Sequence, residues 1–384
     1  MTSSGGVIAF ILTLVVMVIV HEFGHYITAK RFGMRVEEYF FGFGPRIFSR
    51  RIGETEYGIK AIPLGGYVRI SGMNPWQQIP DEEIPRTFGA KPSWQRAIVL
   101  GAGSFTHFVL AFLIFTAMYG VVGLHDPDHP TTKIERISET VDGQPGPAKV
   151  AGLQQGDKVI AVNARAANTW DKVRAEIRKS PGVPITLDVL RDGKTVSVSV
   201  TPLGVKVPVD EAHPARKQTV GQIGVVPTLP VKKESLPRAV VLGAQTTGVA
   251  IARSVVGIGS IFSPHGISRV FGALGGSGRR SADQPFGLVG SARLAGEVAS
   301  AGEFETLVLF LTGFIVFVGV INLVPLPPLD GGHLLVLLIE KVRRRKVDMR
   351  KVVPVAGVVL SFLVILTVVL LYLDIVRPVS NPFQ

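Results

Sequence analysis

The chain has 384 residues, of which 47% are hydrophobic and 18% charged, a composition too apolar for a soluble enzyme of this length. It contains no cysteine, which excludes disulfides, thiolate metal sites and a cysteine nucleophile, so a transition metal must be held by His, Asp or Glu. The formal net charge of +12 comes from short basic runs beside apolar stretches, a pattern typical of membrane orientation and not of nucleic-acid binding.

The first apolar stretch, from Val7 to about Thr28, is long enough to cross a hydrocarbon core of about 30 Å as a helix. No basic residue precedes it and no small-residue cleavage site follows, so we expect a retained span within residues 1–30 and not a signal peptide. It ends in the sequence His21-Glu22-Phe23-Gly24-His25. Histidines four apart share one face of a helix and can bind one Zn²⁺, while Glu22 can take a proton from the attacking water. The cost of burying such groups in a membrane favours a metal site over a chance match.

Residues 31–96 are Gly-rich and alternate between apolar and polar, which predicts short strands and turns on the cytoplasmic side. A second span follows at residues 97–125, from Ala97 to about Leu124. It contains His107, an imidazole in the membrane without an evident task. We expect His107 to bond to a neighbouring helix; contact with a zinc ligand or with substrate is the alternative.

Residues 126–230 have the pattern of a small α+β domain, which we expect outside the cytoplasm. Its centre, Pro147 to Asn163, resembles the PDZ fold. A helix is predicted from about Thr169 to Lys179, followed by strands Ile185–Arg191 and Thr195–Thr201 around the turn Asp192-Gly193. Because PDZ modules serve scaffolds, chaperones and proteases alike, the domain leaves two roles open. It can bind the new C-terminus of a trimmed substrate, or reject proteins whose outer domains are intact.

The connecting region 231–305 contains a long, rather apolar stretch, Ala239–Phe262, interrupted by Arg253. If this stretch crossed the membrane, the next span would reverse and carry Asp330 away from His21. We therefore expect it to lie on the outer surface or against the PDZ domain.

A third span is predicted within residues 306–335, and its apolar stretch from Thr306 to Leu329 leads into a Pro-Leu-Asp-Gly motif. Prolines break a helix, and open backbone at membrane depth is tolerated only where it lines a cavity or is buried in protein. We therefore expect Asp330, at the end of the span, to be the third metal ligand. His333, expected to start the next helix, is the rival ligand, and a simple helix cap is the alternative role for Asp330.

The basic loop at residues 336–351 and the fourth span at residues 352–384, helical from Val352 to Leu373, complete the predicted membrane part. Positive charge in Arg343 to Lys346, and after the first span, places both segments in the cytoplasm. The N-terminus then faces outward.

These motifs together resemble the site-2 protease family of intramembrane zinc metalloproteases (peptidase M50), in its bacterial RseP-like branch. The resemblance covers nearly the whole chain and implies that His21, His25 and Asp330 bind zinc and that Glu22 is catalytic. The segment Glu56–Ile70 matches the family's membrane-associated β-loop, which holds substrate as an added strand. Substrate contacts are then implied for Gly65, Gly66, Tyr67 and Asn322.

One departure from the family lies in the second span. The usual Gly-Pro-x-x-Asn is replaced by Gly103-Ser104-Phe105-Thr106-His107, which leaves the local packing near the site open.

The expected fold is an α-helical integral membrane protein with four transmembrane helices, a membrane-associated β-loop and an inserted α+β PDZ domain. The expected function is zinc-dependent intramembrane cleavage of single-pass proteins such as anti-sigma factors. The expected location is the inner (plasma) membrane, with the active site near the cytoplasmic side, and the expected partners are these substrates and the lipid bilayer, not nucleic acid. A membrane-anchored PDZ adaptor and a metal transporter are the competing functions; a transporter would require more acidic or histidine residues in the spans.

Overall fold

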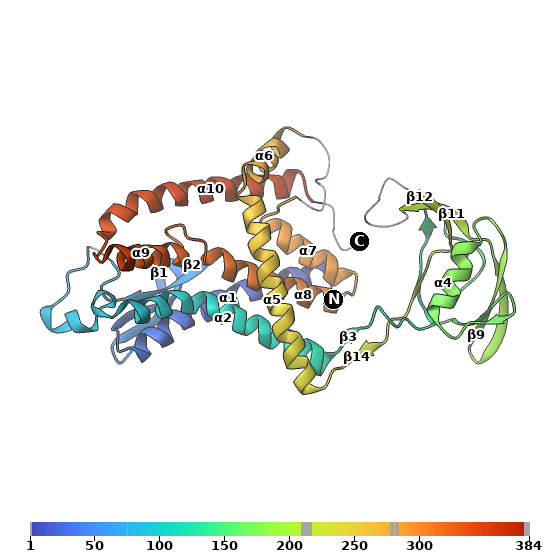
Figure 1. Cartoon of the computed structure of the whole chain (residues 1–384), viewed down its shortest axis with the longest axis horizontal. Helices are drawn as coiled ribbons and strands as arrows, with labels where there is room; N and C mark the ends of the chain where they lie inside the picture. The colour runs from blue at the N-terminus through green and yellow to red at the C-terminus, as the bar shows by residue number, and fades with distance from the viewer. Residues whose placement is uncertain (1, 75, 209–216, 277–279, 281–283, 380–384) are drawn as a thin grey trace. The chain divides into compact units, whose positions relative to one another are not determined.

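The computed structural model describes residues 2–74, 76–208, 217–276, 280 and 284–379 (Figure 1). The chain forms two compact units, and the second, Val122–Glu234, is inserted into the first, which comprises Met1–Val121 and Ser235–Gln384. The end of the predicted C-terminal tail, residues 380–384, lies outside the described residues.

The first unit is built mainly from apolar helices. They are α1 (Ser3–Arg31), α2 (Ser93–Ala117, continued by the π-helical turn η3, Met118–Val122), α5 (Leu236–Ile261), α6 (Pro264–Gly272), α7 (Leu288–Ser300), α8 (Phe304–Asn322), α9 (Asp330–Arg343) and α10 (Val352–Val376). Short 3-10 turns accompany them: η1 (Asp81–Arg86), η2 (Phe88–Ala90), η4 (Ala273–Gly275) and η5 (Met349–Lys351). In the described part of the chain, five helices are long and apolar enough to cross a membrane, namely α1, α2, α5, α8 and α10. That is one more than the four expected, and the addition is α5.

Helix α5 packs within the helical unit, against α2 and α8. An added Cβ at Gly243 would lie 2.3 Å from the hydroxyl of Thr116, and the hydroxyls of Tyr119 and Thr246 are 2.9 Å apart. Figure 1 shows α5 in yellow lying across α2 and α8 instead of running alongside them. The expectation was that this stretch lies on the outer surface or against the PDZ domain, and its contacts with α2 and α8 were not foreseen. Small residues such as Gly243 allow this close helix packing.

The region between α1 and α2 forms a β-hairpin, β1 (Val36–Ile52) and β2 (Thr55–Ile70), that is folded back on itself, so that Glu38–Phe41 pair with Glu56–Ile59 on one side and with Gly66–Arg69 on the other. Short strands and turns were predicted here; the structure has two strands of 17 and 16 residues, each bent so that its parts pair separately. Repeated register shifts between Val36 and Phe48 bend the pair, so glycines that suggested breaks instead occupy irregular positions within continuous strands.

The predicted third span is interrupted. Helix α8 ends at Asn322, seven residues without helix follow, and α9 begins at Asp330. Prolines 325, 327 and 328 account for the gap because they lack the backbone N–H that a helix needs. The expected loop at 336–351 is helical up to Arg343, and two of its aliphatic residues, Val336 and Leu337, are buried against the bundle.

The inserted unit has a buried core of its own around Val159, Trp170 and Leu187. Its main sheet has the order β10-β9-β7-β8, formed by β7 (Lys158–Val162), β8 (Arg165–Ala166), β9 (Ile185–Arg191) and β10 (Lys194–Val200). The remaining elements are β3 (Leu124–His125), β4 (Ile134–Ile137), β5 (Thr140–Val141), β6 (Gln144–Pro145), α3 (Pro147–Val150), α4 (Trp170–Lys179), β11 (Leu203–Pro208), β12 (Lys217–Gln222), β13 (Val225–Pro227) and β14 (Val231–Lys232).

The local predictions for this unit are confirmed. Strand β9 matches the expected range, α4 begins one residue later than expected, and β10 both begins and ends one residue earlier. Asp192 and Gly193 both have positive φ, 49° and 79°, as a two-residue hairpin turn requires.

Candidate metal centre

Helix α1 carries both histidines of the His21–His25 pair on one face. Their rings are 4.8 Å apart between centroids, and their Nε2 atoms are 3.1 Å apart. Four residues make slightly more than one helical turn, so the two side chains lie one above the other and point the same way. Both nitrogens are therefore available to one ion.

A close approach of α2 explains the glycine between the two histidines. An added Cβ at Gly24 would lie 2.5 Å from the carbonyl oxygen of Ala102. On the facing helix, an added Cβ at Gly103 would lie 2.4 Å from His25 Nε2 and 2.7 Å from His21 Nε2. Only glycine at both positions lets α2 pass directly over the imidazoles, and the requirement at Gly103 was not foreseen from the sequence.

Asp330 brings the third ligand atom from far along the chain. Its Oδ2 lies 3.3 Å from His21 Nε2 and 3.4 Å from His25 Nε2, and it is buried without a hydrogen-bond partner among the described residues. Asp330 is the first residue of α9, not the end of the preceding span as expected. A carboxylate in the first turn is favoured by the helix dipole, and the proline-interrupted segment before it sets its position.

The three ligand atoms fit a tetrahedral zinc ion. Ligand atoms about 2.0–2.2 Å from one tetrahedral ion lie about 3.3–3.6 Å from each other, close to the spacings between His21, His25 and Asp330. Two imidazoles and one carboxylate also form a ligand set that leaves one position open for water or substrate. Among the described residues, these three form the cluster of potential metal ligands; the rival ligand His333 is not part of it.

The second ring nitrogen of His25 is held by the backbone. His25 Nδ1 lies 2.7 Å from the carbonyl oxygen of Val99 on α2. A carbonyl only accepts, so Nδ1 carries the proton and Nε2 keeps its lone pair for a metal. The ring is thus oriented before any ion binds.

Glu22 lies between the histidines in sequence and faces strand β2. An added Cβ at Gly66 would lie 3.1 Å from Glu22 Cγ, and the side chain is within electrostatic range of His21, His25 and Asp330. The carboxylate is therefore beside the three ligand atoms without joining them, as a proton acceptor should be.

The sequence as a whole matches known proteases. The model of Peptidase family M50 matches residues 9–366. The chain belongs to peptidase family M50. It is 34% identical to zinc metalloprotease Rip1 of Mycolicibacterium smegmatis over 98% of both chains, and 31% identical to Rip1 of Mycobacterium tuberculosis over 97% of this chain and 98% of that one. It is 29% identical to zinc metalloprotease RasP of Geobacillus kaustophilus over 96% of this chain and 97% of that one.

As a member of family M50, the protein is a membrane-embedded zinc metalloprotease. This excludes the adaptor and the transporter as its principal function.

The residues expected to touch substrate in this M50 protease lie around the β-hairpin and at the end of α8. Gly66 borders Glu22, and Gly65 has a positive φ of 127° beside the ring of Phe43. Asn322 is the last residue of α8.

Tyr67, next to these glycines, is held by its neighbours in the hairpin. Its ring stacks on Phe40, and its hydroxyl donates to Glu38 Oε2. Burial and the bond to Glu38 raise the pKa of Tyr67, which keeps the hydroxyl protonated as a donor.

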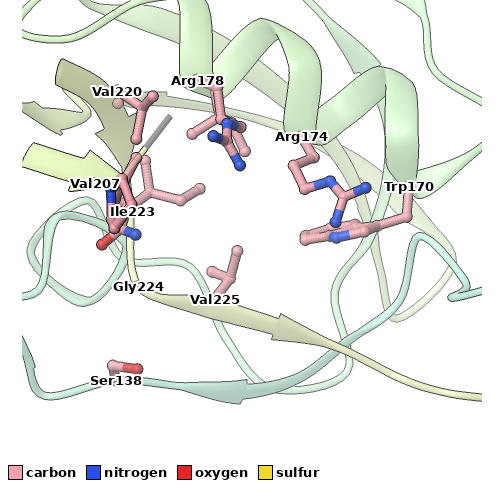
Figure 2. A pocket seen from close by; sticks show the side chains of 13 residues that line it. Ser138, Trp170, Arg174, Arg178, Val207, Val220, Ile223, Gly224 and Val225 are labelled. Atoms are coloured by element: carbon pink, nitrogen blue, oxygen red, sulfur yellow. The ribbon is translucent and has the colours of Figure 1, made fainter. Parts of the chain in front are cut away.

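A separate pocket of about 440 Å³ lies within the inserted unit of the M50 protease, between α4 and the β12–β13 strands. Figure 2 shows Arg174 and Arg178 of α4 on its helical side and Val207, Ile223 and Val225 on its strand side. It combines apolar walls with two cationic groups.

Proposed function

We propose that this zinc metalloprotease is an intramembrane endopeptidase that cuts transmembrane segments, with His21, His25 and Asp330 as zinc ligands and Glu22 as general base. The observation that carries the proposal is the convergence of three ligand atoms, 3.1–3.4 Å apart: two come from α1, a helix long and apolar enough to span a membrane, and the third comes from the start of α9. Groups of this polarity are retained at membrane depth where they bind ions or do chemistry.

The proposed reaction is hydrolysis of a peptide bond. When bound, zinc supplies Lewis acidity for the scissile carbonyl and lowers the pKa of water at the site. Glu22 takes the proton from the attacking water and delivers it to the amine that leaves. His25, fixed through Val99, and Asp330, fixed at the start of α9, keep the ligand set in place during the reaction.

We place four helices across the inner membrane: α1, α2, α8 and α10. Helix α7 packs against the start of α1, where an added Cβ at Gly6 would lie 2.1 Å from the Ala295 carbonyl oxygen. In space, α5 begins beside the end of α2. Because α1 and α2 are antiparallel, the end of α2 lies on the same side of the bundle as the start of α1. Helices α6 and α7, with 9 and 13 residues, are too short to return the chain across a membrane.

This arrangement supports α5 entering the bundle without crossing. Basic residues after α9, Arg343 to Lys346, support the proposal that the metal centre lies nearer the cytoplasm and the inserted unit outside.

The β-hairpin provides the proposed substrate platform. A transmembrane helix must unwind before its backbone reaches Glu22, and pairing with a free edge of the β1–β2 sheet replaces the hydrogen bonds that it loses. Gly65, Gly66, Tyr67 and Asn322 are the residues we propose to line its path. Suitable substrates are single-pass proteins such as anti-sigma factors, already trimmed outside the membrane.

Cleavage of a purified single-pass substrate tests the proposed function. We expect mass spectrometry of the products to place the cut inside the apolar segment, because the metal centre lies between helices of spanning length. A zinc chelator should stop the reaction, and added zinc should restore it. A cut confined to the extramembrane part of the substrate contradicts the proposal.

We also propose that the inserted unit is a PDZ domain whose pocket receives the C-terminal end of a trimmed substrate. The alternative is a size filter that needs no binding. The two guanidinium groups favour binding of an acidic peptide end, since Arg forms strong charge-assisted bonds with carboxylates; Arg174 also bonds to Asp171, 2.8 Å away.

Charge reversal in the pocket separates these roles. The double substitution Arg174→Glu and Arg178→Glu should weaken binding of a short acidic peptide with a free C-terminus by about tenfold or more, measured by calorimetry. Arg165→Glu, on the exposed strand β8 and outside the pocket, is the matched control and should leave binding unchanged. A size filter predicts no binding by the unmodified protein.

A further inference from the structure

His107 is a buried imidazole that the proposed reaction does not use. It lies on α2 four residues after Gly103, so it shares the helix face that passes over the metal centre. Only 1% of the residue is exposed, and its ring lies edge-to-face with that of His21, with 5.1 Å between the centroids and 73° between the planes. Its position is tight, since an added Cβ at Gly319 of α8 would lie 2.9 Å from His107 Cβ.

The neighbours of His107 determine which ring nitrogen carries the proton. Its Nδ1 lies 3.1 Å from the carbonyl oxygen of Ile315 on α8. Because a carbonyl accepts and cannot donate, Nδ1 carries the proton, and Nε2 of the neutral ring presents a lone pair. This Nε2 atom is buried and has no hydrogen-bond partner among the described residues. His107 thus offers an unused acceptor.

His21 offers the complementary donor. Its Nε2 faces Asp330 and His25 in the metal centre, so a neutral ring that binds zinc there carries its proton on Nδ1. Nδ1 of His21 is also buried and has no partner in the described part of the chain, so the two rings face each other without a hydrogen bond between these two nitrogens. Zinc-binding imidazoles almost always donate the second N–H to an acceptor, as His25 does to Val99. His21 requires such an acceptor.

We propose that His107 is a positioning residue whose Nε2 accepts the Nδ1–H of His21 and so fixes the orientation of that zinc ligand. The Met17 carbonyl of α1 also lies near the His107 ring. A carbonyl cannot donate, so it gives the lone pair of His107 Nε2 no hydrogen bond, and the Nδ1–H of His21 is the donor that we assign to it. The inference rests on the proposed zinc ligands. It adds to them a supporting residue on α2, which is held in turn by the backbone of α8.

The test is the zinc affinity of purified full-length variants, measured by competition with a chromophoric chelator. His107→Leu fills the space without an acceptor and should weaken zinc binding by about 10- to 100-fold. His107→Gln can place an amide oxygen near the position of Nε2 and should recover most of the affinity. Substitution by Co²⁺ should give a visible spectrum that differs between His107→Leu and the unmodified protein, because the His21 ring is less constrained. Phe105→Leu, on the exposed side of the same helix, is the control and should change neither.

Two results overturn the inference: zinc affinity of His107→Leu within about twofold of the unmodified protein, or no recovery in a folded His107→Gln. Thermal unfolding of the zinc-free proteins establishes folding, and His107→Gln carries the test if the leucine variant fails to fold. His21→Ala separates this failure from failure of the proposed function. If His21→Ala also leaves zinc binding unchanged, the ligand assignment itself is wrong; if it abolishes binding while His107→Leu does not, only the role of His107 is wrong.

Discussion

Replacing Glu22 with Gln is expected to lower the rate of substrate cleavage by about 10² to 10⁴-fold while zinc remains bound. The amide has nearly the shape of the carboxylate but cannot accept the proton of the attacking water. Because Glu22 lies beside β2 and outside the His21–His25–Asp330 cluster, its replacement removes no metal ligand. Single-turnover cleavage and metal analysis of the same preparation measure the two effects.

The matched control for this substitution is Glu297→Gln on α7, where the carboxylate makes a partly exposed helical ion pair with Arg293 at 3.5 Å. Such pairs contribute little to stability, so cleavage should be unchanged. A Glu22→Gln protein that cleaves at the normal rate would show that another group is the base. One that has lost its zinc would show that Glu22 supports the metal and not only the proton transfer.

The local part of the metal centre could be predicted from the sequence because helical spacing determines it. His21 and His25 share a face in any α-helix, and Glu22, one residue on, points toward the neighbouring face. The choice of Asp330 was less secure, since it depended on two distant segments reaching the same depth. The structure brings Asp330 to 3.3–3.4 Å from both histidines, which supports that choice.

What could not be predicted depends on contacts between distant helices. Neither the closeness of Gly103 to His25 nor the facing of His107 and His21 is encoded in a local pattern. The same holds for α5, whose apolar length fits a span, while its packing against α2 and α8 decides where it lies. The apolar length of a segment indicates whether a helix could cross the membrane, but not how that helix is oriented in the protein.

The length of the β-hairpin was misjudged for a different reason. Glycines usually end strands, and the segment contains several, yet β1 continues through Gly42 and Gly44, both with positive φ. These residues absorb register shifts within the hairpin. A glycine in such a sequence is equally consistent with a bulge and with a turn, so the pattern alone does not set the strand length.

Gly103→Ala is expected to lower both zinc affinity and cleavage, the latter by about 10²-fold, although glycine has no functional group. The added methyl would lie 2.4 Å from His25 Nε2, so either the ring or the α2 backbone must move. The backbone has little freedom to move, because Gly24 of α1 already lies directly against Ala102. The imidazoles must therefore shift, and a displacement of about 1 Å is enough to misplace the reacting groups.

Gly101→Ala is the matched control for this effect, two residues earlier in the same helix, where an added Cβ meets no atom within 4 Å. It should retain zinc and activity and raise the free energy of unfolding by about 0.5–1 kcal/mol, since alanine is the better helix former. Chelator competition, cleavage and thermal unfolding of both variants measure the difference. Equal behaviour of the two would mean that α2 does not press on the imidazoles. A loss confined to Gly103→Ala would instead show that the close passage of α2 over His21 and His25 is itself a requirement for activity.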